Sequence, residues 1–342
     1  MFMANIVMTN ACNLKCPYCF ANEFVNHDKD SISFEMFKEA AEFILGDNKG
    51  HIGLIGGEPL LHPEFKECIS YLLDNRNVKS ITIYTNAVLA EKYYNELAAE
   101  KVRLLINCNS PADMGDAAFA KMSANIHELV VNRHMKDRIT LGINMYKADF
   151  EYDYIVKLLL TYKYDHVRVS ITVPNCEEGK NRSAVDDFIA IKPRMKAFFH
   201  TLLKYGIQPR FDCNKFPVCL WDDSDKAEFA GYYVDKKDEL YMQMLNVECN
   251  PVIDITPDLT AIRCFGMSDC SKESIRDYRN IEELRHYYLN EFDAYKFNTV
   301  CDKKCVNCYN RKTMHCTGGC LSYKVSAITE LRNAAAELMN NG

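Results

Sequence analysis

Three cysteines near the start of the chain have the spacing of ligands to one metal cluster. They form the pattern Cys12-x3-Cys16-x2-Cys19. Three thiolates can bind a 4Fe–4S cube and leave its fourth iron with an open position, which can take a cofactor or a substrate. A zinc site is the weaker alternative, because structural zinc takes four ligands and this loop offers no further Cys or His nearby.

A second group of cysteines lies after residue 210. The chain holds 16 cysteines, and ten of them follow residue 210. The densest run is Cys305-x2-Cys308-x7-Cys316-x3-Cys320. In a reducing compartment such thiols bind metals or do redox chemistry more often than they form disulfides. One alternative is a structural zinc knuckle built from this run, or with His315 in place of one of its cysteines.

Alternating strands and helices are predicted for about half of the chain. Strand-like runs cover residues 4–10, 52–56, 80–86, 103–109, 139–146 and 166–173. Amphipathic helical patterns cover residues 33–45, 63–74, 89–100, 116–131 and 153–162. This order is typical of six βα units with a parallel sheet. Since a closed eight-unit barrel needs about 250 residues, we expect an α/β fold with a partial (β/α)6 TIM-like barrel. An open doubly wound sheet is the alternative.

The pattern changes after residue 174. We predict helices at residues 191–205, 236–245 and 325–339, a strand at 208–213 and a short hairpin at 252–264. A shift in composition near residue 190 divides the chain into a barrel, residues 1–190, and a linker with a small cysteine-rich α+β domain, residues 191–342.

The first cysteine triplet directly follows the first predicted strand. It therefore lies at the face where the loops of parallel barrels build active sites.

Two motifs in this barrel carry a family resemblance. The segment Cys12-Asn13-Leu14-Lys15-Cys16-Pro17-Tyr18-Cys19 resembles the cluster-binding loop of radical S-adenosylmethionine (SAM) enzymes. The second predicted strand ends in Gly56-Gly57-Glu58-Pro59, which is similar to the GGEP motif of that family. The resemblance implies a 4Fe–4S cluster on the cysteine triplet, with SAM on its open iron. Reductive cleavage of SAM then gives a 5′-deoxyadenosyl radical that abstracts hydrogen from a substrate.

The resemblance also implies residues that contact SAM. The backbone of Gly56 and Gly57 can approach the methionine ammonium group, and Glu58 can offset the charge of that group. Tyr18 resembles an aromatic residue that packs beside the adenine. Polar residues at the ends of later strands are further cofactor-binding candidates, namely Thr85, Asn107, Asn109 and Asn144. For these four, capping of the following helix is the alternative role.

The later cysteines resemble the SPASM or twitch domain of radical SAM peptide maturases, which binds one or two auxiliary 4Fe–4S clusters. On this resemblance we assign two ligand sets. The first set is Cys219, Cys249, Cys264 and Cys320, and the second set is Cys301, Cys305, Cys308 and Cys316. Some maturases that invert stereochemistry return a hydrogen atom from a thiol. Cys176 and Cys213 are the candidates for that catalytic role.

Composition limits the partners of the protein. The 41 Lys and Arg residues against 47 Asp and Glu residues give a net charge of −6, which argues against binding to nucleic acid or to an anionic membrane surface. No apolar run is long enough to span a bilayer, and the first residues have no signal-peptide pattern. We therefore expect a cytoplasmic protein.

Three functions fit these patterns. The first is a radical SAM enzyme that crosslinks or epimerises a ribosomally made peptide. The second is a radical SAM dehydrogenase or epimerase of a small molecule such as an aminoglycoside, and the third is a non-catalytic iron–sulfur electron carrier. An enzyme of this kind needs a reductant such as flavodoxin or ferredoxin. Because the first predicted strand opens the chain, we expect a peptide precursor to bind the barrel, the cysteine-rich domain or a separate leader-peptide-binding protein.

Overall fold

The structure is a computed structural model that describes residues 4–19, 21–22, 24–26, 30–46, 50–172, 183–212, 216–231, 249, 251–314 and 316–340. The chain divides into two compact units. Unit 1 comprises Met1–Ile143 and Pro251–Tyr288, and unit 2 comprises Asn144–Asn250 and Leu289–Gly342. The sequence-based division near residue 190 stays a prediction. None of the described helices is long and apolar enough to cross a lipid bilayer.

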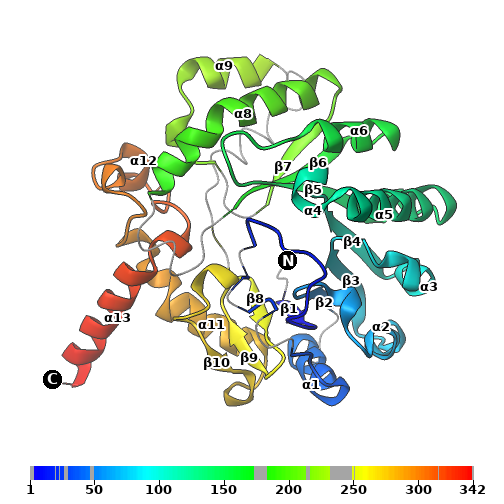
Figure 1. Ribbon diagram of the computed structural model, residues 1–342. Coiled ribbons are helices and arrows are strands. Elements are labelled where there is room, and N and C mark those ends of the chain that lie inside the picture. Colours follow the sequence, from blue (N-terminus) through cyan, green and yellow to red (C-terminus); the bar gives the residue numbers. More distant parts are fainter. Residues whose placement is uncertain are drawn as a thin grey trace. The chain divides into compact units, whose positions relative to one another are not determined.

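A parallel sheet forms the core of unit 1 (Figure 1). Its strands β1 (Ala4–Val7), β2 (Gly50–Ile55), β3 (Val78–Thr85), β4 (Val102–Asn107) and β5 (Ile139–Met145) pair in chain order, each parallel to the next. These strands are rich in Ile, Leu and Val, which is typical of strands covered on both faces. Ile6, Leu54, Ile83 and Ile106 are fully buried. The strand predictions for these segments are confirmed to within a few residues.

The sheet of unit 1 continues past β1 into a distant part of the sequence. β8 (Ile253–Ile255) pairs with β1 in parallel, β9 (Thr260–Ile262) pairs antiparallel with β8, and β10 (Glu273–Ser274) pairs antiparallel with β9. The hairpin is confirmed. Its pairing with β1 is not predictable from the sequence, because a short apolar run carries no signal for the strand edge that it joins.

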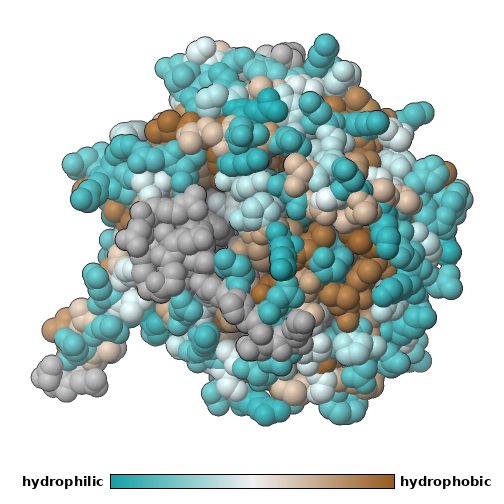
Figure 2. Space-filling model, in the orientation of Figure 1, coloured by the Kyte–Doolittle hydropathy of each residue, from teal (hydrophilic) through white to brown (hydrophobic). Residues whose placement is uncertain are grey.

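The helices of unit 1 are α1 (Phe34–Leu45), α2 (Phe65–Asp74), α3 (Tyr94–Leu97), α4 (Pro111–Met114), α5 (Asp116–His127) and α11 (Ile281–Glu291). α1 shows how the sequence forms them. The Ser33 side chain caps its start by accepting a hydrogen bond from the Met36 backbone N–H. Phe37, Ala40 and Ile44 recur at helical spacing and are buried. Figure 2 shows the mostly hydrophilic surface over α2, α3 and α5.

Unit 2 contains α6 (Asp153–Thr161), β6 (His166–Ile171), α8 (Ala184–Lys204), β7 (Gln208–Phe211), α9 (Asp223–Gly231), α12 (Tyr309–Lys312) and α13 (Val325–Asn340). β6 and β7 pair in parallel. α8 begins earlier than predicted, because Ser183 caps its start and accepts a hydrogen bond from the Asp186 N–H. The helix predicted at residues 236–245 lies outside the described residues.

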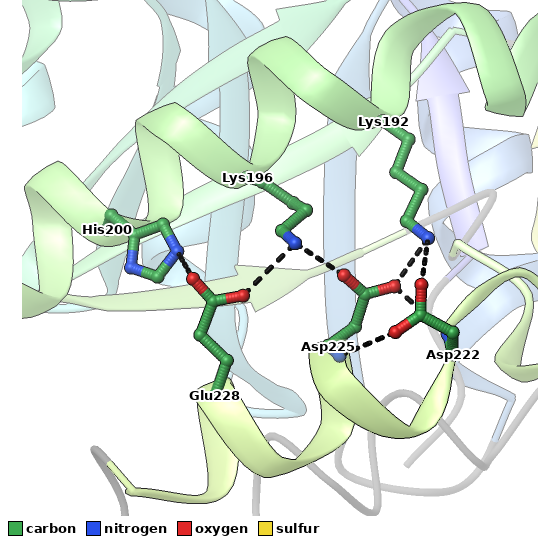
Figure 3. A network of polar contacts seen from close by, with 6 residues as sticks. All are labelled: Lys192, Lys196, His200, Asp222, Asp225 and Glu228. Carbon is green, nitrogen blue, oxygen red and sulfur yellow. Dashed lines mark hydrogen bonds and ion pairs between the residues drawn. The ribbon is translucent and has the colours of Figure 1, made fainter.

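An ion-pair network joins α8 to α9 (Figure 3). Asp225 of α9 binds both Lys192 and Lys196 of α8, and its side chain is only 2% exposed. Glu228 pairs with Lys196 at 3.0 Å and with His200. Asp222 accepts a hydrogen bond from the Asp225 backbone N–H at 2.8 Å and so caps the start of α9. The network fixes one face of α9 on α8.

Candidate functional site

The first three cysteines lie in the loop that leaves β1 in unit 1. Cys12, Cys16 and Cys19 are partly buried. The side-chain oxygen of Asn26 accepts a hydrogen bond from the backbone N–H of Cys12 at 2.9 Å. Cys19 packs against an apolar cluster that contains Val7. The loop therefore keeps its three thiols on well-packed backbone at the end of the first strand.

These thiols suit a cationic ligand. Burial raises the pKa of Cys12 to about 12 and that of Cys16 to about 11, and it also raises the pKa of Cys19. Without a positive partner the three groups stay protonated at neutral pH. Iron supplies the charge that stabilises thiolates in such a site. The donor set therefore fits an iron–sulfur cluster, which takes the thiolate form of cysteine as its ligand.

The loop after β2 packs tightly against the cysteine loop. A side-chain carbon on Gly57 would lie 2.2 Å from the backbone oxygen of Ala11, and one on Gly56 would lie 2.5 Å from that of Thr9. The Glu58 N–H donates a hydrogen bond to the Ala11 oxygen at 2.8 Å. Both glycines are thus required by the close approach of two backbones. Their expected contact with the SAM ammonium group stays a prediction.

Glu58 is fully buried and joins the loop after β2 to the end of β3. Its carboxylate accepts hydrogen bonds from the Thr85 hydroxyl at 2.6 Å and from the Asn86 backbone N–H at 2.8 Å. Burial raises the pKa of Glu58 to about 7, and the hydrogen bonds oppose that rise. Thr85 is therefore a direct partner of Glu58, and the predicted role of Glu58 toward SAM is untested.

Asn109 follows β4 and contacts the cysteine loop. Its side-chain nitrogen donates a hydrogen bond to the Cys16 sulfur at 3.1 Å, and its oxygen accepts the hydroxyl hydrogen of Tyr18. Asn107 lies in β4 and is partly buried. Asn144 belongs to unit 2, where it accepts a hydrogen bond from Arg168 at 2.7 Å. Of the four strand-end candidates, Thr85 and Asn109 touch residues of the two motif loops.

Asn13 and Asn26 are also part of this site, and no sequence motif indicates a role for their side chains. The Asn86 side chain donates a hydrogen bond to the Asn13 side-chain oxygen at 2.8 Å. Asn26 has a φ of 63°, a left-handed conformation that asparagine tolerates better than most residues. Asn26 accepts the hydrogen bond from the Cys12 N–H, fourteen residues earlier. Its tolerance of the left-handed conformation is the one local sequence signal at this position, and this signal does not identify Cys12 as the partner.

A second thiol-rich site lies in unit 2. A pocket is lined by five cysteines, Cys219, Cys301, Cys305, Cys308 and Cys316, together with apolar residues, Arg311 and two glycines. We call it the unit 2 thiol pocket. A side-chain carbon on Gly319 would lie 2.2 Å from the Cys301 sulfur, so this glycine lets the chain pass the thiol. A hydrogen bond from Cys301 lowers the pKa of Cys305 to about 7.

The two predicted ligand sets stay predictions. Cys219, which we assign with Cys249, Cys264 and Cys320, lines the same pocket as the four cysteines of the other set. The reason is local, since Cys219 lies in the short η5 helix (Val218–Leu220) directly after Pro217, which also lines the pocket. Cys264 follows β9 in unit 1, whereas Cys249 and Cys320 belong to unit 2.

Several other predicted positions bear on these sites. Cys176, Cys213 and His315 lie outside the described residues. Among the residues that the structure describes, no three His, Cys, Asp or Glu side chains converge on a single-ion site.

The fold and the first thiol site define an α/β protein with a three-cysteine loop after its first parallel strand. Residues 6–151 match the family model of the radical SAM superfamily. Such a domain implies SAM and a 4Fe–4S cluster as its cofactors.

Curated relatives share parts of the sequence. An uncharacterised protein of Methanocaldococcus jannaschii is 41% identical over 102 residues, which are 29% of this chain and 33% of that protein. A probable GTP 3′,8-cyclase of Methanococcus maripaludis is 27% identical over 290 residues, 82% of this chain and 91% of that protein. The subtilosin biosynthesis protein AlbA of Bacillus subtilis is 30% identical over 94 residues, 28% of this chain and 20% of that protein.

Solved structures share the fold over most of the chain. The structure of anSMEcpe with bound AdoMet and the Cp18Cys peptide has a TM-score of 0.64 at 17% identity and covers 94% of this chain and 89% of that one. Streptococcus suis SuiB bound to S-adenosylmethionine has a TM-score of 0.61 at 15% identity and covers 94% of this chain and 73% of that one. This likeness confirms the predicted α/β fold with a barrel that is not closed.

Proposed function

We propose that the protein is a radical SAM enzyme that abstracts hydrogen from a peptide. The observation that supports radical chemistry is the contact among the loops that follow β1, β2, β3 and β4 in unit 1. In this set, Cys16 contacts Asn109, and Glu58 ties the glycine loop to β3. The likeness of the fold to structures with a bound peptide supports a peptide substrate. These structures are anSMEcpe with the Cp18Cys peptide and SuiB with its precursor peptide SuiA, and each matches 94% of this chain.

The residues of unit 1 have distinct roles in this proposal. Cys12, Cys16 and Cys19 would hold the cluster. When bound there, cluster and SAM together supply a 5′-deoxyadenosyl radical. Asn109 places a hydrogen-bond donor on the Cys16 sulfur, and Glu58 fixes the glycine loop. Gly57 brings that loop against Ala11, so that the glycine loop and the cysteine loop form one rigid wall.

Unit 2 would hold at least one auxiliary 4Fe–4S cluster in the unit 2 thiol pocket. Its ligands are drawn from the five cysteines that line the pocket, with Cys301, Cys305, Cys308 and Cys316 as the first choice. A cluster there would supply an electron acceptor, which suits an oxidative outcome such as a crosslink. A reductant such as flavodoxin or ferredoxin and a separate leader-peptide-binding protein are proposed partners.

A nucleotide is the second candidate substrate. It is favoured by the match to the probable GTP 3′,8-cyclase of Methanococcus maripaludis, which extends over 91% of that protein. This candidate replaces the aminoglycoside as the small-molecule alternative, because a sequence match of that length supports it.

Product analysis separates the two substrates. The protein is reconstituted anaerobically with iron and sulfide, reduced with dithionite, and given SAM with either GTP or a peptide encoded beside the gene. Formation of 5′-deoxyadenosine together with a peptide that has lost hydrogen supports the peptide reaction. Consumption of GTP with release of 5′-deoxyadenosine, and no change in any peptide, would replace it by the nucleotide reaction.

A further inference from the structure

We infer that Lys324 is the buried counter-charge of the unit 2 thiol pocket, and that its ammonium group favours the reduced form of a cluster bound there. The inference deepens the proposed function and rests on it for the presence of the cluster. It assigns a positioning role to a residue that no motif in the sequence indicates.

Lys324 is unusual in its burial. It is the residue directly before α13 and is only 1% exposed. Its Nζ donates hydrogen bonds to the backbone oxygen of Lys296 at 2.9 Å and to that of Thr317. The thiols of Cys301, Cys316, Cys320 and Cys249 lie close enough for negative charge on them to act on this ammonium group. No carboxylate forms an ion pair with it in the described part of the chain.

The two hydrogen bonds connect the segments that carry the thiols. Thr317 lies between Cys316 and Cys320, and Lys296 lies before Cys301 on the other segment. The same loop is held by the Gly318 N–H, which donates to the Cys316 sulfur at 3.3 Å, and by the Gly318 oxygen, which accepts from the Cys301 N–H at 2.9 Å. Lys324 therefore lies at the junction of both thiol-bearing segments.

A buried ammonium group without a partner anion is costly. Burial lowers the pKa of Lys324 to about 8, and negative charge on Cys301 and Cys316 opposes that effect. A cluster held by four thiolates is itself negative, and its reduction adds one more negative charge. A fixed positive charge in a low-dielectric surrounding favours that added electron, so it raises the reduction potential of the cluster.

The test uses the full chain with the changes Cys12→Ala, Cys16→Ala and Cys19→Ala, so that all bound iron belongs to other sites. In this parent we introduce Lys324→Gln, which keeps hydrogen-bond donors and loses the charge. The matched control is Lys303→Gln, an exposed lysine of the same cysteine segment. Iron per chain and the midpoint potential are measured after anaerobic reconstitution, the latter by redox titration followed by electron paramagnetic resonance.

We expect Lys324→Gln to keep its iron and to shift the potential to more negative values, with no shift in Lys303→Gln. An unchanged potential in an iron-loaded Lys324→Gln protein would overturn the inference. If Lys324→Gln loses iron, Lys324→Arg decides, because it restores the charge: recovered iron supports the inference and continued loss overturns it. A parent protein that binds no iron would instead refute the auxiliary cluster of the proposed function.

Discussion

The side-chain amide of Asn109 donates a hydrogen bond to the sulfur of Cys16 across 3.1 Å. The two residues are 93 positions apart, one in the loop after β1 and the other directly after β4. A donor on a cluster-ligating sulfur withdraws negative charge from it and makes reduction of the cluster easier. The strand order of the sheet thus sets the electronic surroundings of the cysteine loop.

Replacement of Asn109 by Leu removes this donor. We expect the potential of the first cluster to become more negative and the rate of SAM cleavage to fall about 10- to 100-fold, the usual effect of losing a hydrogen bond to a metal ligand. The measurement is 5′-deoxyadenosine formation, with a redox titration of the same sample. Asn132→Leu, at an exposed position after α5, is the control. Equal rates and potentials in Asn109→Leu and wild type would rule out this role.

Gly57 tests the contact between the two motif loops. The Cβ of Gly57→Ala would lie 2.2 Å from the backbone oxygen of Ala11, and a backbone atom cannot move aside cheaply. We expect this variant to lose most of the iron bound by the first cysteine loop. Gly50→Ala is the matched control, since its Cβ would meet only the flexible end of Leu45 at 3.1 Å. Full iron content in Gly57→Ala would show that the close packing is not needed.

Gly57 and Asn109 show which parts of the site can be predicted from the sequence and which cannot. The cysteine spacing and the glycine motif each follow a predicted strand, so local patterns place them at the same end of a parallel sheet. The contact between Asn109 and Cys16 depends on how β1 and β4 are spaced in the sheet, and no local pattern contains that spacing. The same limit applies to Asp254, whose neighbour Asn5 lies at the other end of unit 1's sequence.

Cys219 and Lys324 illustrate a second limit. The family resemblance assigns Cys219 to the set of Cys249, Cys264 and Cys320, whereas in the structure it lines a pocket with the cysteines of the other set. Pro217 and the short η5 helix that follows it bring Cys219 to the pocket. Lys324 has the surroundings of a core residue because it is buried among thiol-bearing loops, but in the sequence it resembles any lysine before a helix. Burial of a charged side chain follows from tertiary packing and has no local signature.

Asp254 gives unit 1 a pH-dependent stability. Burial raises the pKa of Asp254 from 3.8 to about 7, with the Asn5 hydrogen bond opposing. Between pH 3.8 and 7 the folded state therefore holds a proton that the unfolded state releases, so the contribution of Asp254 to stability is greatest below pH 3.8 and falls as pH rises toward 7. The loss over this window is about 4 kcal/mol.

Asp254→Asn keeps an oxygen for Asn5 and removes the titration. Denaturant unfolding of this variant at several pH values is expected to show a smaller decrease in stability with rising pH than wild type. Glu35→Gln, at a side chain that is 80% exposed, is the control and should keep the wild-type slope. Parallel pH profiles for Asp254→Asn and wild type would contradict the assignment.

The α8–α9 network predicts a graded loss of stability in unit 2 (Figure 3). Asp225 is buried between two lysines, whose hydrogen bonds outweigh burial and lower its pKa. Asp225→Asn leaves both ammonium groups without their shared anion and should cost about 3 kcal/mol. Glu228→Gln, whose side chain is 38% exposed, should cost less, because solvent screens its ion pairs. Denaturant unfolding measures both, and equal losses would refute the central place of Asp225.

The most direct test of radical SAM chemistry compares the wild-type chain with the Cys12→Ala/Cys16→Ala/Cys19→Ala variant after anaerobic reconstitution. Iron per chain and dithionite-dependent formation of 5′-deoxyadenosine from SAM are measured on both. We predict SAM cleavage by the wild type and none by the variant, which should still keep about four irons per auxiliary cluster. Cleavage by the variant at the wild-type rate, or no cleavage by an iron-loaded wild type, would contradict the account.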